Sequence, residues 1–172
     1  MIDKRLIEII RAQFRLDWHG IHGARHWSRV RENGLRLATQ TGARSDVVEL
    51  FAFLHGSQRV ADGADLGHGP RAAQFVSALR CQGVLRLDGE GFELLSLACT
   101  FHSNGLTAGD VTVLTCWDAD RLDLGRVGTY PDPRYLCTDA ARNAQVIMEC
   151  YNRSRWQSPR AFVFGNWEHE PK

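Results

Sequence analysis

The sequence has almost no net charge and lacks the features of several large protein classes. Its 172 residues carry 21 lysines and arginines against 20 aspartates and glutamates, which leaves a net charge of +1. No overall field therefore draws the protein to nucleic acid or to an anionic membrane, and we find no specific nucleic-acid signature. Any ligand has to be bound at a local site.

Paired cysteines and long apolar runs are also missing. The five cysteines, at positions 81, 99, 116, 137 and 150, form no C-x-x-C pair and are odd in number, which argues against a zinc ribbon or a disulfide scaffold. We expect them to be reduced and mostly buried. No uninterrupted apolar run of about 18 residues occurs, so we expect no signal peptide and no membrane span. The expected location is cytoplasmic, and the oligomeric state stays open.

Lysine is nearly absent. Only Lys4 and Lys172 are lysines, and the other basic residues are arginines. Guanidinium groups suit the recognition of anions, whereas a general coding bias toward arginine gives the same composition. The sequence leaves both explanations open.

Apolar residues recur at helical spacing almost throughout, and alternating strand patterns are nearly absent. Leu6, Ile10 and Phe14 lie on one stripe of an N-terminal helix, and a second helix is expected from 25 to 41, ending at Gly42. The pattern predicts a single all-α domain of roughly seven helices over residues 1–152, followed by a C-terminal tail at 153–172.

The third predicted helix is the most apolar. Asp46 followed by Glu49 indicates its N-cap, and residues 47–54 are apolar nearly all round, which places this helix in the centre of the fold. A long polar loop follows from Ser57 to Gly69, and such loops are often functional.

Capping signals place the remaining helices. Pro70 suits the first turn of a fourth helix, and a fifth helix carries His102. Thr107 with Asp110 three residues later predicts the start of a sixth helix. Thr138 opens a seventh.

Seven histidines are the unusual feature of the composition. His26 begins a predicted helix and His55 ends the most buried one, where an imidazole without a partner costs free energy. Asp120 lies on the same helical face as Trp117 and Cys116, so its carboxylate is expected to point inward and to need a cation. A shared metal ion would satisfy all three side chains.

These segments resemble the HD superfamily of metal-dependent phosphohydrolases. The family has a helical H-x-x-R-V segment, then a His-Asp pair after a buried helix, then a distant aspartate. Here His26-x-x-Arg29-Val30, Leu54-His55 and Ala119-Asp120-Arg121-Leu122 occur in that order. Segments 68–73 and 98–105 fall where members with a second metal site have further histidines. The resemblance covers about residues 18–140 and implies an HD-domain-like helical fold.

The resemblance implies a set of metal ligands with one member missing. His26, His55 and Asp120 would hold a first divalent ion, and His68 and His102 a second. The residue after His55 is Gly56, where dinuclear members have an aspartate that bridges the two ions. Four other carboxylates near these positions are possible substitutes: Asp62, Asp65, Asp118 and Asp123.

The resemblance also suggests residues that contact the substrate. Arg59 stands four positions after His55, where dinuclear relatives often have a lysine that meets the phosphate, although it is equally a loop residue able to pair with an aspartate. Arg29 and Arg121 adjoin ligand positions and are either substrate-facing or structural. His22 is a candidate for the rim of the site.

The expected function is therefore metal-dependent hydrolysis of a small phosphate ester or nucleotide, with Asp120 and Arg59 as catalytic groups and Zn, Mn, Fe, Ni or Mg as the ion. The absent aspartate at Gly56 is expected to impair it. The alternative is a catalytically inactive HD-like module that binds a metal or a nucleotide. A purely structural helical protein, the third possibility, would leave His26, His55 and Asp120 without a common partner.

Overall fold

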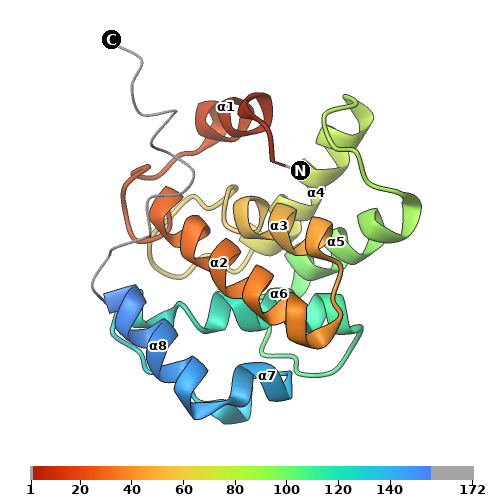
Figure 1. Ribbon diagram of the computed structural model, residues 1–172. Helices are drawn as coiled ribbons and strands as arrows, with labels where there is room; N and C mark the ends of the chain where they lie inside the picture. Colours follow the sequence, from red (N-terminus) through yellow and green to blue (C-terminus); the bar gives the residue numbers. More distant parts are fainter. Residues whose placement is uncertain (1, 156–172) are drawn as a thin grey trace.

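Every regular element in the computed structural model is a helix across residues 2–155, the part of the chain that the structure describes. This confirms the predicted all-α class (Figure 1). The α-helices are α1 (Lys4–Gln13), α2 (Ala24–Thr41), α3 (Ser45–Leu54), α4 (His68–Cys81), α5 (Gly89–Phe101), α6 (Val111–Arg121), α7 (Asp139–Arg142) and α8 (Ala144–Arg155), and two 3-10 helices, η1 (Leu124–Val127) and η2 (Pro133–Tyr135), lie between α6 and α7.

Helix α3 forms the centre of the fold, as its apolar sequence predicts. Its residues Val47, Phe51, Phe53 and Leu54 are fully buried, and it packs against α2, α5 and α6 (Figure 1). Helices α2 and α6 also pack directly against each other. The polar ends of these central helices are therefore held close together by the apolar core.

A second, smaller core lies under α7 and α8, the blue helices at the bottom of Figure 1. Leu37 of α2 and Leu122 at the end of α6 meet Ile147 of α8 there. This cluster fixes the segment after α6, including η1, against α8.

Of the ends of α2, α3 and α7, two were predicted correctly from their capping residues. Gly42 ends α2 in the left-handed region with φ of 75°, which glycine adopts without strain, and Thr138 caps α7 as predicted. Asp46 is not the N-cap of α3, because the helix starts at Ser45 and the Asp46 carboxylate accepts from Val47 N in the first turn.

The predicted start of the sixth helix at Thr107 is wrong. Helix α6 begins at Val111, and Asp110 caps it by accepting from the backbone N–H of Thr112. The seventh predicted helix is divided in two, because the backbone leaves the helical region at Asn143 between α7 and α8. His68, which we expected in the loop from 57 to 69, is the first residue of α4.

The expected boundary between domain and tail falls inside α8, which runs to Arg155; the rest of the expected tail lies outside the described residues. All five cysteines are free, with Cys81 exposed and the other four buried. None of the described helices has both the length and the apolar character needed to cross a membrane.

Candidate metal centre

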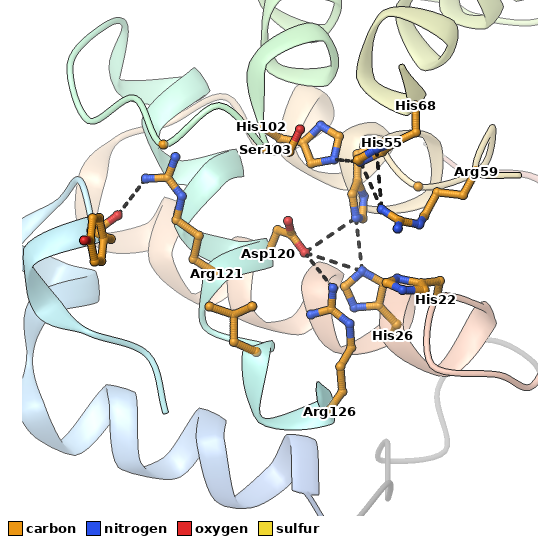
Figure 2. A pocket seen from close by; sticks show the side chains of 14 residues that line it. His22, His26, His55, Arg59, His68, His102, Ser103, Asp120, Arg121 and Arg126 are labelled. Carbon is orange, nitrogen blue, oxygen red and sulfur yellow. Dashed lines mark hydrogen bonds and ion pairs between the residues drawn. The ribbon is translucent and has the colours of Figure 1, made fainter. Parts of the chain in front are cut away.

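Three side chains from three different helices converge in one cavity. His26 lies in the first turn of α2, His55 directly follows α3, and Asp120 lies near the end of α6. One ligand atom from each lies within 4.8 Å of the other two, although 29 and 65 residues separate them along the chain. The predicted convergence of this triad is thus found in the structure (Figure 2).

The His26 ring is held in one tautomer by Asp123. Its Nδ1 lies 2.7 Å from Asp123 Oδ2, and that carboxylate also accepts two hydrogen bonds from Arg29, at 2.6 and 3.0 Å. A carboxylate held in this way accepts hydrogen bonds, so Nδ1 carries the proton and Nε2 presents a lone pair. Burial, and then the charge of Arg126, lower the pKa of His26 well below its usual value, which keeps the ring neutral.

The His55 ring is fixed in the same tautomer by the helix that precedes it. Its Nδ1 donates to the carbonyl oxygen of Phe51 at 3.0 Å, and the ring stacks on the Phe51 ring at 4.8 Å between centroids. Burial lowers the pKa of His55, so this imidazole is also neutral. Its Nε2 lies 3.1 Å from the Nε2 of His26, lone pair toward lone pair.

Asp120 adds a third acceptor. Its Oδ1 is buried without a hydrogen-bond donor, and lies 3.4 Å from His26 Nε2 and 3.7 Å from His55 Nε2. Burial alone favours the neutral acid, but the positive charge around the carboxyl, above all that of Arg126, outweighs burial and holds the pKa of Asp120 below its usual range. The group is therefore a carboxylate facing two nitrogen lone pairs.

This donor set fits a divalent metal ion. Two neutral imidazoles and a carboxylate are common protein ligands for zinc and other transition metals. A tetrahedral site with bonds of about 2.0–2.1 Å places neighbouring donors about 3.3–3.4 Å apart, and the three separations here are 3.1, 3.4 and 3.7 Å. The hydrogen bonds to Asp123 and to Phe51 are the outer contacts that typically orient metal-binding histidines.

His68 and His102 form a second pair in the same cavity. The Nδ1 of His102 donates to the carbonyl oxygen of Cys99 at 2.8 Å, and the Nδ1 of His68 donates to that of Asp65. Their Nε2 atoms face each other at 2.7 Å. Burial lowers the pKa of His102 to about 3. In the described part of the chain no third donor completes this pair as Asp120 completes the first.

The cavity has a volume of about 320 Å³, at the lower end of the range for sites that bind small ligands. Its lining consists of His22, His26, His55, Gly56, Arg59, His68, His102, Ser103, Gly105, Asp120, Arg121, Leu124, Arg126 and Tyr135. Histidines and arginines thus dominate a space large enough for a small phosphate ester.

Arg59 lines the cavity, as we expected of a substrate-binding arginine. Its Nη2 donates to the carbonyl oxygen of Gly63 at 2.8 Å, and its Nη1 lies 3.3 Å from His68 Nε2. The loop from 57 to 67 therefore holds the guanidinium beside the second histidine pair. It forms no ion pair with Asp62 or Asp65 in the described structure; Asp65 pairs with Arg71 instead.

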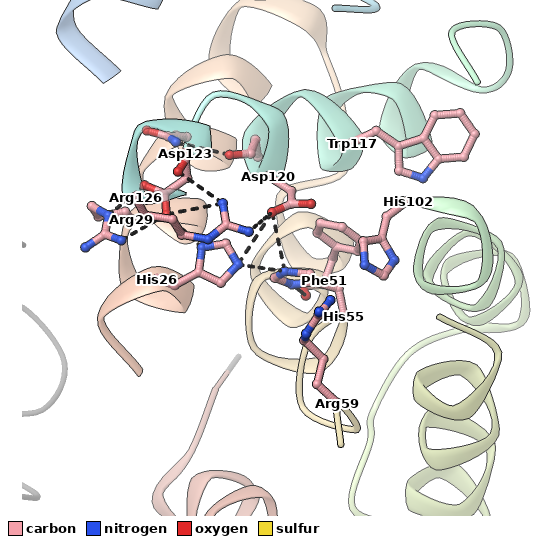
Figure 3. Close-up of polar contacts among 12 residues, drawn as sticks. His26, Arg29, Phe51, His55, Arg59, His102, Trp117, Asp120, Asp123 and Arg126 are labelled. Atoms are coloured by element: carbon pink, nitrogen blue, oxygen red, sulfur yellow. Dashed lines mark hydrogen bonds and ion pairs between the residues drawn. The ribbon is translucent and has the colours of Figure 1, made fainter. Parts of the chain in front are cut away.

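Arg126 is a lining residue that the sequence analysis missed. It comes from η1, and its Nη2 lies 3.7 Å from Asp120 Oδ1 (Figure 3). The signal was present in the three-residue spacing of Asp120, Asp123 and Arg126, which places all three on one side of a helical segment. It was overlooked because η1 was not predicted.

Two arginines expected near the substrate have structural contacts. Arg29 does not line this cavity, because its guanidinium is bound to Asp123 on the side of His26 away from His55 (Figure 3). Arg121 lines the cavity but donates to the carbonyl oxygens of Tyr135 and Leu106 at 2.6 and 2.7 Å. Figure 2 shows its guanidinium directed away from Asp120.

His22 lies where it was expected, but none of the candidate substitute carboxylates does. His22 lines the cavity and its Nε2 donates to the carbonyl oxygen of Asp62 at 3.1 Å, while burial lowers its pKa to about 4. Of the carboxylates considered as substitute ligands, Asp118 accepts from the backbone N–H groups of Cys137 and Thr138, and Asp123 contacts His26 only as an outer partner. None of them replaces the aspartate absent at Gly56.

Gly56 lines the cavity and does not require a left-handed backbone. A Cβ added there would lie 3.2 Å from Nε1 of Trp27. That indole N–H is buried and has no acceptor. A side chain at position 56 would therefore enter a tight space that offers one unused donor.

Comparisons of the chain with protein-family models, with curated proteins and with solved structures find no match. The assignment of this site rests on the geometry described above.

Proposed function

We propose that this protein is a metal-dependent phosphohydrolase of the HD type that acts on a small phosphate ester or nucleotide. The observation that carries the proposal is the meeting of three acceptors, two imidazole lone pairs and an ionised carboxylate, without a hydrogen between them. Acceptors packed in this way repel one another, and a cation bound between them would remove that repulsion.

His26, His55 and Asp120 would hold the ion. When bound, a divalent ion lowers the pKa of a coordinated water and polarises a phosphoryl oxygen. The chain itself supplies the charge that an anionic substrate needs, because Arg59 and Arg126 both line the cavity. A guanidinium presents paired N–H groups to phosphate oxygens and stabilises charge that develops on them.

The expected activity is low for this class. Gly56 contributes no carboxylate, so no side chain at that position can join the two histidine pairs or accept a proton from an attacking water. His68 and His102 are neutral and their Nε2 atoms carry lone pairs, so this pair offers proton acceptors within the cavity.

The test is reconstitution of metal-depleted protein with Mn, Fe(II), Ni, Zn or Mg, one at a time. Bound metal is measured by elemental analysis, and hydrolysis is measured on nucleoside monophosphates and an aryl phosphate. We expect about one ion per chain and metal-dependent release of phosphate. Asp120→Asn should abolish both, whereas Asp132→Asn, which changes a surface carboxylate paired with Arg134, should abolish neither.

The second candidate, an inactive module that binds a metal or a nucleotide, is favoured by Gly56. It predicts a bound ion or a bound nucleotide with no release of phosphate under any of these metals. Protein that takes up none of the five ions would contradict the first candidate, and protein that binds neither an ion nor a nucleotide would contradict both.

A further inference from the structure

A second hollow lies on the other side of Arg126 from the metal centre, and the proposed hydrolysis makes no use of it. Its volume is about 130 Å³. The residues around it are His19, Gly20, Ile21, Arg25, Arg29 and Arg126. Three guanidiniums and one imidazole line it, and no carboxylate does.

Asp123, the carboxylate bound to Arg29, is already paired. Asp123 is 1% exposed, and its two oxygens accept from Arg29 Nε and Nη2 and from His26. Nη1 of Arg29 has no partner among the described residues. Arg25 lies one helical turn before Arg29 on the same face of α2, is exposed, and pairs with none of the described carboxylates. The side chains that line the hollow therefore include three guanidiniums and no carboxylate; Arg126 lies 3.7 Å from Asp120 and 3.9 Å from Asp123.

Arg126 supplies an unused donor inside the fold. Its side chain is only 9% exposed, and its Nε is buried without a hydrogen-bond partner. Its Nη1 donates to the carbonyl oxygen of Asp123 at 3.0 Å, which fixes the guanidinium between the two cavities. A buried guanidinium with a free N–H indicates an acceptor that belongs beside it.

Arg25, in the first turn of α2, lines the same hollow. Its N-cap is Gly23, which has no side chain to accept from the helix, and the N–H groups of Arg25 and His26 have no acceptor in the described structure. Helix α1 differs, because Asp3 caps it by accepting from Leu6 N. An 18-residue helix that begins uncapped beside three arginines combines partial positive charge with full positive charges.

We propose that this hollow binds one tetrahedral oxyanion of the size of phosphate, held by Arg25, Arg29, Arg126 and the first turn of α2. The bound group is either free inorganic phosphate or a second phosphate of the substrate. The second source rests on the proposed function, and the binding itself does not.

The binding test uses the full chain in the presence of a chelator, so that no metal takes part. Inorganic phosphate is titrated and followed by the backbone amide resonances in two-dimensional NMR. We expect the amides of Gly20, Ile21, Arg25 and His26 to shift together with one dissociation constant. Shifts confined to the amides near His68 and Ser103 would contradict the proposal.

Two matched variants measure how much Arg25 contributes to phosphate binding in the hollow. Arg25 and Arg5 are both the second residue of a helix and both exposed. Arg25→Gln should weaken phosphate binding at these amides about tenfold, the effect of losing one charge-assisted hydrogen bond, and Arg5→Gln should not change it. Equal weakening or no weakening in the two variants overturns the proposal, as does the absence of any saturable binding.

A kinetic comparison identifies the source of the anion. If the hollow binds a second phosphate of the substrate, Arg25→Gln raises the KM of a nucleoside diphosphate about tenfold and leaves the KM of the monophosphate unchanged. If the hollow binds free phosphate, neither KM changes. Added phosphate should then alter the rate of the parent protein but not that of the variant. Absence of hydrolysis with every substrate contradicts the proposed function but leaves the result of the NMR titration standing.

Discussion

His26 and His55 face each other through their Nε2 atoms, as do His68 and His102, but only the first pair has a carboxylate beside it. The Nε2 atoms of the first pair are 3.1 Å apart, close to the spacing of neighbouring donors in a tetrahedral metal site, and those of the second pair are 2.7 Å apart. Outer contacts fix all four rings in the same tautomer. The third donor, and not the histidines, distinguishes the two halves of the cavity.

The two pairs nevertheless form one row. The ring centroids of His26 and His55 are 5.1 Å apart, those of His55 and His102 are 5.1 Å apart, and those of His102 and His68 are 4.6 Å apart. Gly56 follows His55 in the middle of this row. A single added carboxylate at that position would connect the halves, and the following predictions test how far they are separate.

The largest effect is expected from removing the third donor. Asp120→Asn should weaken metal binding at least about 100-fold, since it replaces an anionic ligand in the centre with a neutral one. Competition with a chelator of known affinity measures the change. His68→Gln serves as the control and should change the same constant less than about threefold; a similar loss in both variants would mean that the two halves act as one site.

The second-largest effect is expected from changing Asp123, which contacts the Nδ1 of His26 on the side away from the candidate metal centre. Asp123→Asn should weaken metal binding about 10-fold to 100-fold, because Asp123 fixes the His26 tautomer. It should also lower the free energy of unfolding by about 3 kcal/mol, because Arg29 loses its buried partner.

Asp118→Asn separates these two effects. Asp118 is fully buried and bonded to Cys137 and Thr138, away from the ligands. We expect a comparable loss of stability in urea denaturation and unchanged metal affinity. Loss of metal affinity in this variant would show that destabilisation alone explains the result for Asp123→Asn.

Gly56→Asp should place a carboxylate between the two histidine pairs of the cavity. The backbone at position 56 tolerates a side chain, and the free indole N–H of Trp27 can donate to the new carboxylate. We expect a second bound ion per chain and a rise in turnover of about tenfold on aryl phosphates. Gly56→Ala is the matched control, since it makes the same Cβ contact without the carboxylate. A folded Gly56→Asp protein that gains neither metal nor activity would favour the inactive module.

The smallest effect is expected in the half without a carboxylate. His102→Ala should raise the KM for a monophosphate about threefold, because His68, which contacts Arg59, loses the ring that packs against it. The ion at the first centre should be retained, and the midpoint of thermal unfolding should fall by only a few degrees, the cost of removing one buried ring. A large fall in melting temperature with no change in KM would assign His102 to packing alone.

Sequence patterns predicted the helical class, the buried α3 and the convergence of His26, His55 and Asp120, because these depend on local periodicity and on polar residues placed at the ends of apolar helices. They did not predict the residues that contact these three side chains from outside. Arg126 and Arg29 reach the centre through contacts set by the packing of η1 and α2, and no local pattern distinguishes an arginine that faces substrate from one that supports a histidine. The break at Asn143 was missed for the same reason, since the pattern of apolar residues runs on across it.

The convergence of helix ends described for the fold also bears on how the chain unfolds. An ion shared by His26, His55 and Asp120 would cross-link α2, α3 and α6 and close chain segments of 29 and 65 residues. None of these helices could then separate without forfeiting the binding free energy of the ion. Amide hydrogens in the three helices would exchange at one common slow rate, and proteases would find the apo form far easier to cut than the metal-loaded form.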